Sequence, residues 1–424
     1  MKIKGELSLQ GDKSISHRCA LFSSLYKGKS QFQNFPSSND CLATLDCLIK
    51  LGISCNLSDN QLIIEGKGRF GYTESLTVLD ARNSGTTIRL LSGILAAQRF
   101  DSIIQGDKHL NRRPMARILI PLRMMGAKID AKKNDFPPLS FQPVHSLKGI
   151  EYDLPVSSAQ VKSCILLAGL HASNDTIVIE KQKTRDHTER MLGLKIVELE
   201  NHNKKIYCNP DIEINDLSMY IPGDISSSAF FIIAALLLPG SELLIKNVSL
   251  NPSRTGILDV LKKMGFTGNV ELKQSIPEPM GDIYVTHQHL NNISLDGDII
   301  PGIIDEIPIL SILAVRSEGR FSVRDASELR VKESDRIHSI CQNLRKLGIK
   351  LEEHKDGFEF YGPQVLQGGK VVTADDHRIA MAFAVANLIS SDTIVLDNPE
   401  CVNVSFPDFW KKLSELSDGI NTAV

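Results

Sequence analysis

One pattern recurs six times along this chain of 424 residues. Each copy begins with a short polar segment rich in Ser, Asp or Asn, continues as an apolar run of helical length, and ends with a small turn and a β-branched strand. The copies begin at residues 13, 83, 157, 224, 305 and 376, so they lie roughly 70 to 80 residues apart. A period of this length excludes a thin solenoid and predicts supersecondary units with two helices and several strands each.

A second helix in most copies ends on a Leu-Gly or Met-Gly pair, and a strand follows. A glycine at this place fits the left-handed conformation that closes many helices. The pairs are Leu51-Gly52, Met125-Gly126, Leu192-Gly193, Met264-Gly265 and Leu347-Gly348. They repeat with the same period as the polar segments.

The first helix of each unit is unusually apolar on all sides, most clearly over residues 230–238. A helix without a polar face is buried. We therefore expect an α/β (α+β) fold of two domains, each with three βαβαββ-type units whose helices lie inside and whose sheets lie outside. Because Ser, Thr, Asn or Asp stands at each of these helix starts, symmetric packing would bring the helix N-termini together and create an anion site.

The composition excludes several other classes of protein. Lys and Arg total 48 against 50 for Asp and Glu, so there is no basic excess to bind nucleic acid, and any anion binding has to be local. The eight cysteines lack the spacing of zinc or disulfide frameworks, which predicts reduced thiols in a cytoplasmic protein. The longest apolar run, residues 229–238, is about half a membrane span, and the N-terminus has no signal-peptide core, so we expect neither an anchor nor export.

Cationic side chains gather where the helices begin. Lys13 and Arg18 lie at the first helix start, Arg82 and Arg89 at the second, and Arg378 at the sixth. Further Arg-rich loops span 112–117, 184–190 and 328–336. Any one of these groups is typical of a solvated loop with charge pairs. Their recurrence at equivalent points of a repeat instead predicts one cleft for an anion with several oxygens.

Carboxylates accompany two of these regions. Lys332, Glu333 and Arg336 lie at positions i, i+1 and i+4, so on a helix Lys332 and Arg336 would share a face beside a carboxylate. Asp305 and Glu306 form a second acidic pair at a helix entry. Each group has two interpretations. It is a surface charge motif or a helix cap, or it is a proton donor or acceptor beside an anion clamp.

Eight motifs, in order along nearly the whole chain, resemble the signatures of the 5-enolpyruvylshikimate-3-phosphate synthases, also called 3-phosphoshikimate 1-carboxyvinyltransferases. They occupy residues 11–18, 83–87, 112–115, 158–163, 185–189, 222–227, 329–336 and 376–381. The resemblance implies the enolpyruvyl transferase fold and the sixth step of the shikimate pathway, which leads to chorismate and the aromatic amino acids. In that step the enolpyruvyl group of phosphoenolpyruvate passes to the 5-hydroxyl of shikimate 3-phosphate, and phosphate leaves.

The resemblance also implies the domain plan. One domain would span 12–223 and carry most contacts to shikimate 3-phosphate. The other would combine 1–11 with 224–424 and carry much of the phosphoenolpyruvate site, with the active site in the cleft between the two. Neither a metal nor an organic cofactor is implied. The expected protein is a monomer with small-molecule substrates, without a nucleic-acid or membrane partner, and glyphosate is its expected inhibitor.

Functional residues carry over from the family motif by motif. Those expected to hold shikimate 3-phosphate are Lys13, Ser14, Arg18, Ser157, Ser158, Gln160, Arg185, Asp305 and Lys332. Those expected around phosphoenolpyruvate are Lys13, Gly85, Arg113, Gln160, Glu333, Arg336 and Arg378. The implied reaction is addition and then elimination through a tetrahedral intermediate. In our catalytic hypothesis Asp305 accepts or orients the proton of the 5-hydroxyl, with Lys13 beside it, and Glu333 or Lys332 delivers a proton to the methylene carbon.

Two positions depart from the better-studied branch of the family. Leu90 stands where that branch has Pro. Val404 stands where it has a Lys before a Thr-Phe-Pro turn, so one expected phosphoenolpyruvate contact is replaced. The motifs at 11–14 and 185–189 resemble a divergent bacterial branch whose members can tolerate glyphosate, whereas Gly85 is the residue expected of sensitive enzymes.

Two alternatives stay open. The related UDP-N-acetylglucosamine enolpyruvyl transferases share the six-unit fold, but they rely on a loop cysteine, and the equivalent stretch 107–114 has none. A non-catalytic anion-binding protein could retain the fold, but every motif acid and cation is present except the Lys replaced by Val404.

Overall fold

The computed structural model describes residues 1–200 and 203–417. The chain forms two compact units: the N-terminal unit, Gln10–Ile221, and the C-terminal unit, Met1–Leu9 with Pro222–Val424. The family resemblance implies crossings near residues 11 and 223, and residues 418–424 of the second expected domain lie outside the described part of the chain.

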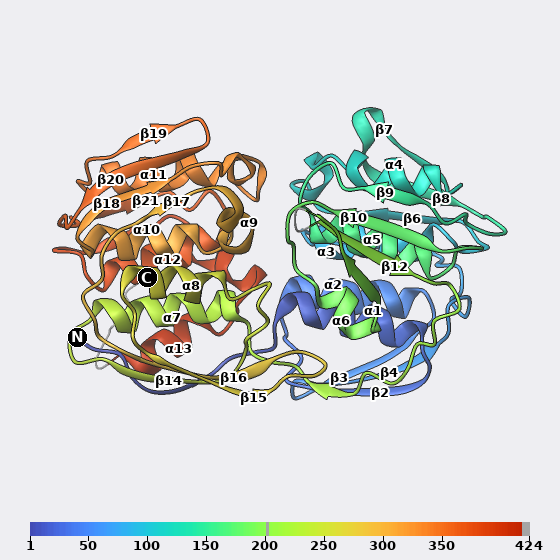
Figure 1. The fold of residues 1–424 in the computed structure, drawn as a ribbon, viewed down its shortest axis with the longest axis horizontal. Helices are drawn as coiled ribbons and strands as arrows, with labels where there is room; N and C mark the ends of the chain where they lie inside the picture. The colour runs from blue at the N-terminus through green and yellow to red at the C-terminus, as the bar shows by residue number, and fades with distance from the viewer. Residues whose placement is uncertain (201–202, 418–424) are drawn as a thin grey trace. The chain divides into compact units, whose positions relative to one another are not determined.

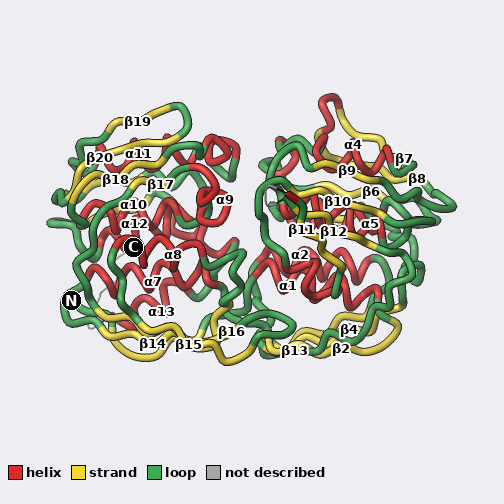
Figure 2. The backbone as a smooth tube through the Cα atoms, viewed as in Figure 1, coloured by secondary structure: helices red, strands yellow, loops and turns green. Residues whose placement is uncertain are grey.

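Sheets form the outer side of the N-terminal unit, and helices lie inside it (Figures 1 and 2). Its strands are β2 (Lys27–Gln33), β3 (Ser54–Ser58), β4 (Gln61–Lys67), β5 (Leu79–Asp80), β6 (Ser102–Gln105), β7 (Lys128–Lys132), β8 (Phe136–Gln142), β9 (Glu151–Asp153), β10 (Thr176–Glu180), β11 (Lys195–Glu198), β12 (Lys204–Cys208) and β13 (Met219–Tyr220). They form three sheets of orders β13-β2-β4-β3, β5-β6-β8-β7 and β11-β12-β10-β9. In each sheet one edge pair is parallel and the other pairings are antiparallel.

The helices of this unit alternate between buried and half-exposed positions. They are α1 (Lys13–Leu25), α2 (Asn39–Lys50), α3 (Gly85–Leu95), α4 (Ala116–Met124), α5 (Ala159–Gly169) and α6 (His187–Leu192), with 3-10 turns at Leu110–Arg112 and Lys133–Asp135. Nearly every side chain of α1, α3 and α5 is buried. This confirms the expectation that the first helix of each repeat lies in the core. α3 and α5 are mainly apolar, whereas α1 also buries the polar side chains of Ser16, His17, Arg18, Ser23 and Ser24.

The C-terminal unit repeats the same plan. Its strands are β1 (Lys4–Ser8), β14 (Glu242–Ser249), β15 (Asn269–Gln274), β16 (Met280–Thr286), β17 (Ser294–Leu295), β18 (Gly319–Val323), β19 (Glu352–His354), β20 (Gly357–Gly362), β21 (Gly369–Val371) and β22 (Ile394–Leu396). Its helices are α7 (Ile225–Leu237), α8 (Gly256–Met264), α9 (Ile300–Ile303), α10 (Ile307–Arg316), α11 (Arg336–Lys346), α12 (His377–Asn387) and α13 (Phe409–Leu416), with 3-10 turns at Gly297–Ile299, Ser327–Val331 and Pro399–Val404. Helices α7, α10 and α12 are buried in the middle of the unit (Figure 1).

Two repeats obtain their first strand from a distant part of the sequence. β1 pairs in parallel with β14, which lies more than 200 residues further along the chain. β13, at the end of the N-terminal unit, pairs in parallel with β2 at its beginning. Each exchange completes the same four-stranded order that the other full repeats build from adjacent residues.

The sixth repeat departs from the expected pattern. Among the residues described up to 417, its sheet has only the parallel pair β21-β22, and the chain then forms a 3-10 turn and α13 where two antiparallel strands stand in the other repeats. Aromatic residues explain the change. Phe406 and Phe409 pack on Phe231 of α7 with ring centroids 6.0 and 5.8 Å apart, so burial against the core replaces strand pairing.

The glycine pairs and the polar helix starts that the sequence analysis singled out have nearly all the expected conformations and contacts. The glycines of the five Leu-Gly and Met-Gly pairs all have left-handed φ angles. Side chains cap five of the six buried helices, from Asp12, Ser84, Ser158, Asp224 and Asp376. The exception is α10, whose N-cap is Glu306 without a side-chain cap bond. Within the described residues, no helix combines the length and the apolar character needed to cross a membrane.

Candidate active site

The site residues predicted from the sequence fall into two sets, one in each unit. In the N-terminal unit Arg18 occupies the centre of its set. Its side chain is buried, and its guanidinium donates from Nε to Thr188 Oγ1 at 2.8 Å and from Nη2 to Ser163 Oγ at 2.7 Å. Its Nη1 donates to the carbonyl oxygen of Ser14 at 2.8 Å. Arg18 of α1 therefore connects α1, α5 and α6 at their ends.

Three predicted serines lie on the segments near Arg18, at the starts of α1 and α5. The Nη1 of Arg185 donates to Ser14 Oγ at 3.3 Å, from the loop that precedes α6. Ser158 caps α5 by accepting from the backbone N–H of Val161. Ser157 donates to Gln182 Oε1 at 2.7 Å. The start of α1, the start of α5 and the loop before α6 thus bring hydroxyl groups, backbone N–H groups and guanidinium groups together, which is the donor set of an anion site.

A second group lies at the start of α3. Gln160 accepts from Arg89 Nη1 at 2.7 Å through its Oε1, and its Nε2 donates to Thr86 Oγ1 at 3.0 Å. A Cβ atom added to Gly85 would lie 2.6 Å from Arg89 Nη1 and 3.5 Å from Arg113 Nη1. Arg89 was noted in the sequence as a cation at a helix start but was not among the predicted site residues. Its contact with Gln160 places it beside that set.

Lys13 opens α1 and forms an ion pair with Asp40 of α2, with 2.7 Å between Lys13 Nζ and Asp40 Oδ2. Asp40 was not predicted as a site residue. It lies in the first turn of α2, where an acidic residue is typical of a helix start, so the sequence offers no separate signal for its role.

In the C-terminal unit a buried guanidinium holds the predicted acids together. Arg336, 1% exposed, donates from Nε to Asp376 at 2.7 Å, from Nη2 to Glu333 at 2.6 Å and from Nη1 to Asp305 at 3.2 Å. Burial acts to lower the pKa of Arg336, but the charges of Asp376, Glu333 and Asp305 raise it above its ordinary value. Arg336 therefore stays charged and gathers three carboxylates within hydrogen-bond reach.

Asp305 also meets the second predicted cation. Arg378 Nη1 donates to the Asp305 carbonyl oxygen at 3.0 Å, and Arg378 Nη2 lies 3.6 Å from the Asp305 carboxylate. The cap interpretation of Asp305 is wrong, because Glu306 takes the N-cap position of α10. The prediction that Lys332 and Arg336 share a helix face is also wrong. Helix α11 begins only at Arg336, and Lys332 lies before it, directly after a 3-10 turn.

Asp376 is a site residue that sequence reasoning missed. It is fully buried, it caps α12 through the backbone N–H of Arg378 at 2.9 Å, and it binds Arg336. The start of the sixth repeat indicates Asp376 only as a helix start, because a cap and an ion-pair partner have the same sequence signature.

A buried acid lies directly behind Asp305. Glu306 is buried and accepts a hydrogen bond from Ser226, whose hydroxyl in turn accepts from Arg254 Nη2 at 2.6 Å. Burial raises the pKa of Glu306 above its ordinary value, against the lowering effect of Arg254. This group connects the starts of α7 and α10.

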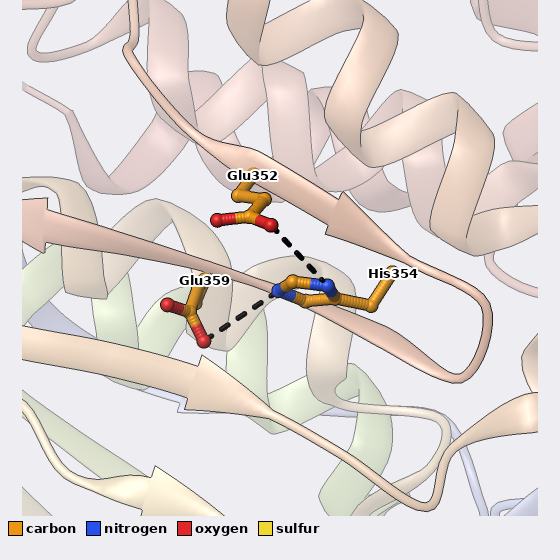
Figure 3. Close-up of side chains that lie close together, drawn as sticks. All are labelled: Glu352, His354 and Glu359. Atoms are coloured by element: carbon orange, nitrogen blue, oxygen red, sulfur yellow. Dashed lines mark ion pairs between the residues drawn. The ribbon is translucent and has the colours of Figure 1, made fainter.

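One group in the described part of the chain has ligand atoms close enough for a metal ion. Figure 3 shows Glu352, His354 and Glu359 on the β19-β20 hairpin, with their ligand atoms within 4.8 Å of one another. However, the Glu359 carboxylate already accepts from Arg320 and Arg324 at 2.8 and 2.7 Å. Two guanidinium groups at the same oxygen oppose the binding of a cation.

Comparison with known proteins identifies the family. The model of EPSP synthase (3-phosphoshikimate 1-carboxyvinyltransferase) matches residues 1–413. The chain belongs to the EPSP synthase family. A 3-phosphoshikimate 1-carboxyvinyltransferase of Syntrophomonas wolfei is 47% identical to this chain over 418 residues, or 98% of this chain and 97% of the relative. Another 3-phosphoshikimate 1-carboxyvinyltransferase, from Bacillus subtilis, is 44% identical over 420 residues, or 98% of this chain and 97% of that relative.

Solved structures show the same relationship. An EPSP synthase from Acinetobacter baumannii has a TM-score of 0.88 and 39% identity, and the match covers 98% of this chain and 96% of that one. The enolpyruvyl transferase NikO from Streptomyces tendae has a TM-score of 0.75 at 15% identity, over 98% and 95% of the two chains, which shows a shared fold alone. The expected enolpyruvyl transferase fold is thereby confirmed.

The two departures from the better-studied branch of the EPSP synthase family take ordinary places in the structure. Leu90 is fully buried within α3, so it packs in the core. Val404 ends the 3-10 turn Pro399–Val404 and is half-buried.

Proposed function

We propose that this chain performs the family reaction at the two sets of residues described above. It is an enzyme of EC class 2.5.1.19 and acts in the shikimate pathway of aromatic amino acid biosynthesis. It transfers the enolpyruvyl group of phosphoenolpyruvate to shikimate 3-phosphate. The observation that supports the site most strongly is the contact of Arg336 with Asp305, Glu333 and Asp376.

Shikimate 3-phosphate would bind mainly to the N-terminal unit. Its phosphate would meet Ser14, Arg185 and the N-terminus of α5 with Ser157 and Ser158. Two contacts support this, because Arg185 contacts Ser14 and Ser157 contacts Gln182 of the same loop. Arg18, also a member of the proposed set, supports that arrangement by its hydrogen bonds to Ser14, Ser163 and Thr188. The remaining members of the proposed shikimate 3-phosphate set are Lys13, Gln160, Asp305 and Lys332.

Phosphoenolpyruvate would require cations for both its carboxylate and its phosphate. Arg336 and Arg378 of the C-terminal unit both lie close to the Asp305 carboxylate. Arg113, Lys13, Gln160 and Gly85 of the N-terminal unit would complete the proposed set, together with Glu333. Planar guanidinium groups can bind each anionic group by two parallel hydrogen bonds, so several Arg side chains suit this compact polyanion.

The chemistry needs two proton transfers in each half-reaction. In the addition, the 5-oxygen loses its proton and bonds to the central carbon of phosphoenolpyruvate, while the methylene carbon gains a proton. In the elimination, the bond between carbon and the phosphate oxygen breaks, that oxygen gains a proton as phosphate leaves, and the new methyl group loses a proton to restore the double bond. We assign the oxygen side to Asp305 with Lys13, and the carbon side to Glu333 or Lys332. The cations would stabilise charge on the departing phosphate.

The proposal also covers the oligomeric state, the cellular location, the expected inhibitor and the absence of a metal from the reaction. We expect a monomer in the cytoplasm, in keeping with eight cysteines that are free thiols in the structure. We also expect glyphosate to compete with phosphoenolpyruvate, since it likewise carries one carboxylate and one phosphorus-centred anion. No metal is part of the proposed reaction.

The test is release of phosphate from phosphoenolpyruvate by the purified chain with different acceptors. We expect release with shikimate 3-phosphate and none with UDP-N-acetylglucosamine. Release with the UDP-sugar alone would assign the chain to the related activity. Binding of both phosphorylated substrates without release would favour a non-catalytic anion-binding protein.

A further inference from the structure

A fully buried ammonium group lies next to the proposed phosphate site. Lys162 of α5 is 0% exposed, and its Nζ lies 2.9 Å from Glu180 Oε1 and 2.6 Å from Glu189 Oε1. Burial acts to lower the pKa of Lys162, but the two carboxylates raise it above its ordinary value. The group is therefore a charged lysine held between the end of β10 and helix α6.

Glu180 does more than neutralise Lys162. The same Oε1 atom accepts from the backbone N–H of Thr184 at 2.9 Å and from the Thr184 hydroxyl. Glu180 ends β10, so its carboxylate closes the loop that leads from this strand toward α6. Glu189 has no such contact with Thr184 among the described residues, although it binds the same ammonium group.

The next residue after Thr184 is Arg185, whose guanidinium lies 3.3 Å from Ser14 Oγ. Arg185 is only half-buried, and it stands on a loop with no strand or helix of its own. Its placement therefore depends on what fixes the backbone on either side. On the side toward α6, the helix itself fixes the backbone. On the side toward β10, the contact of Glu180 with Thr184 fixes it.

We propose that Glu180, held in place by Lys162, is a positioning residue that sets the location of Arg185 and thereby the affinity for shikimate 3-phosphate. Glu180 itself is buried and contacts Lys162 and Thr184, neither of which is a proposed substrate-binding residue, so its effect passes through Thr184. This inference rests on the proposed role of Arg185 in the phosphate site. A guanidinium displaced by an ångström loses most of its directed hydrogen bonds to phosphate, so a small loop shift has a large effect on binding.

The first test compares Glu180→Met with Glu189→Met by steady-state kinetics. Each variant removes one carboxylate from Lys162 and leaves the other ion pair, so both lose a similar amount of electrostatic stabilisation. Only Glu180→Met removes the acceptor for Thr184. We expect the KM for shikimate 3-phosphate to rise at least about fivefold in Glu180→Met, with the KM for phosphoenolpyruvate and kcat changed less than twofold. Equal kinetic changes in the two variants would overturn the proposal.

The conservative variant Glu180→Gln provides a rescue. Its amide oxygen can still accept from Thr184, so we expect a KM for shikimate 3-phosphate within about twofold of the wild-type value. An impairment as large as that of Glu180→Met would show that the contact with Thr184 does not carry the effect, and the proposal would fail.

An Arg185→Ala background separates this inference from the proposed function. If Arg185 binds the phosphate, Arg185→Ala alone raises the KM for shikimate 3-phosphate, and an unchanged KM would contradict the proposed site. If Glu180 acts through Arg185, adding Glu180→Met to Arg185→Ala changes the KM by less than about twofold. A further increase equal to that in the single variant would overturn the positioning role alone.

Thr184→Val keeps the test decisive if Glu180→Met does not fold. It removes only the hydroxyl contact from a half-buried loop residue. We expect an increase of about two- to threefold in the KM for shikimate 3-phosphate and no change in the melting temperature. An unchanged KM would contradict the proposal.

Discussion

Asp376 and Arg336 form a fully buried ion pair, with 2.7 Å between Arg336 Nε and Asp376 Oδ2. Asp376 also caps α12, because its side chain accepts from the backbone N–H of Arg378 two residues later. The Asp376 carboxylate thus fixes Arg336 by direct contact and Arg378 through the start of α12. Both arginines are proposed to bind phosphoenolpyruvate. The proposed phosphoenolpyruvate site of the C-terminal unit is therefore organised around a residue that is not itself proposed to touch the substrate.

Asp376→Asn should weaken both folding and phosphoenolpyruvate binding. The amide keeps an oxygen for the cap but leaves Arg336 with one buried anion fewer. We expect the free energy of unfolding to fall by roughly 2 to 4 kcal/mol and the KM for phosphoenolpyruvate to rise, as measured by urea denaturation and steady-state kinetics. Asp335→Asn is the matched control, since Asp335 also caps a helix and pairs with an arginine but is only partly buried. It should cost less than about 1 kcal/mol, and equal losses in the two variants would contradict the account.

The local features of the fold could be predicted from the sequence because each depends on neighbouring residues. A left-handed glycine such as Gly265, or the cap Ser84, works within one turn of helix, so its signal lies in a short segment. The burial of α7 could also be predicted from its uniform apolar character, whereas α1 is buried despite its polar residues. The replacement of two strands by α13 could not, because it depends on Phe406 and Phe409 finding space beside α7.

The predicted site residues were found by motif, but their partners were not. Asp40, Arg89 and Asp376 act through contacts with residues 27, 71 and 40 positions away in the chain, respectively. No local pattern distinguishes such a residue from an ordinary helix cap or surface charge. Asp305 shows the opposite case, since its position at a helix entry favoured a cap and its real contacts are two arginines.

Gly85→Ala should lower sensitivity to glyphosate. The added methyl group would lie 2.6 Å from Arg89 Nη1, so the guanidinium has to move into or away from the proposed phosphoenolpyruvate site. Because the obstructing atom is the end of a flexible side chain, the variant should fold normally. We expect the inhibition constant for glyphosate to rise at least about tenfold, and by more than the KM for phosphoenolpyruvate. An unchanged inhibition constant would refute this steric argument.

Acid should destabilise the protein partly through His17. Burial is the main cause that lowers the pKa of this imidazole to about 3, whereas the unfolded chain has a value of about 6.5. Between these values only the unfolded chain binds the proton. The free energy of unfolding therefore falls as the pH drops below 6.5, by up to about 1.4 kcal/mol per pH unit, and His17 has no such effect above that pH.

The comparison of wild type with His17→Gln isolates this contribution. Glutamine keeps a polar partner for Thr44, which lies 2.7 Å from His17 Nδ1. Urea denaturation at pH 7 and pH 5 should show a loss for the wild type that exceeds the loss for the variant by about 2 kcal/mol. Parallel losses in the two proteins would mean that His17 is protonated in the folded state.

The central claim is that the carboxylates gathered around Arg336 perform the proton transfers of the family reaction. The most direct measurement is kcat for Asp305→Asn and Glu333→Gln, together with the dissociation constants for both substrates. The account predicts that turnover falls more than about a hundredfold in each variant, while binding changes little, because the amides keep the shape of the site but cannot exchange a proton. Near-normal turnover in either variant would contradict the role assigned to that residue.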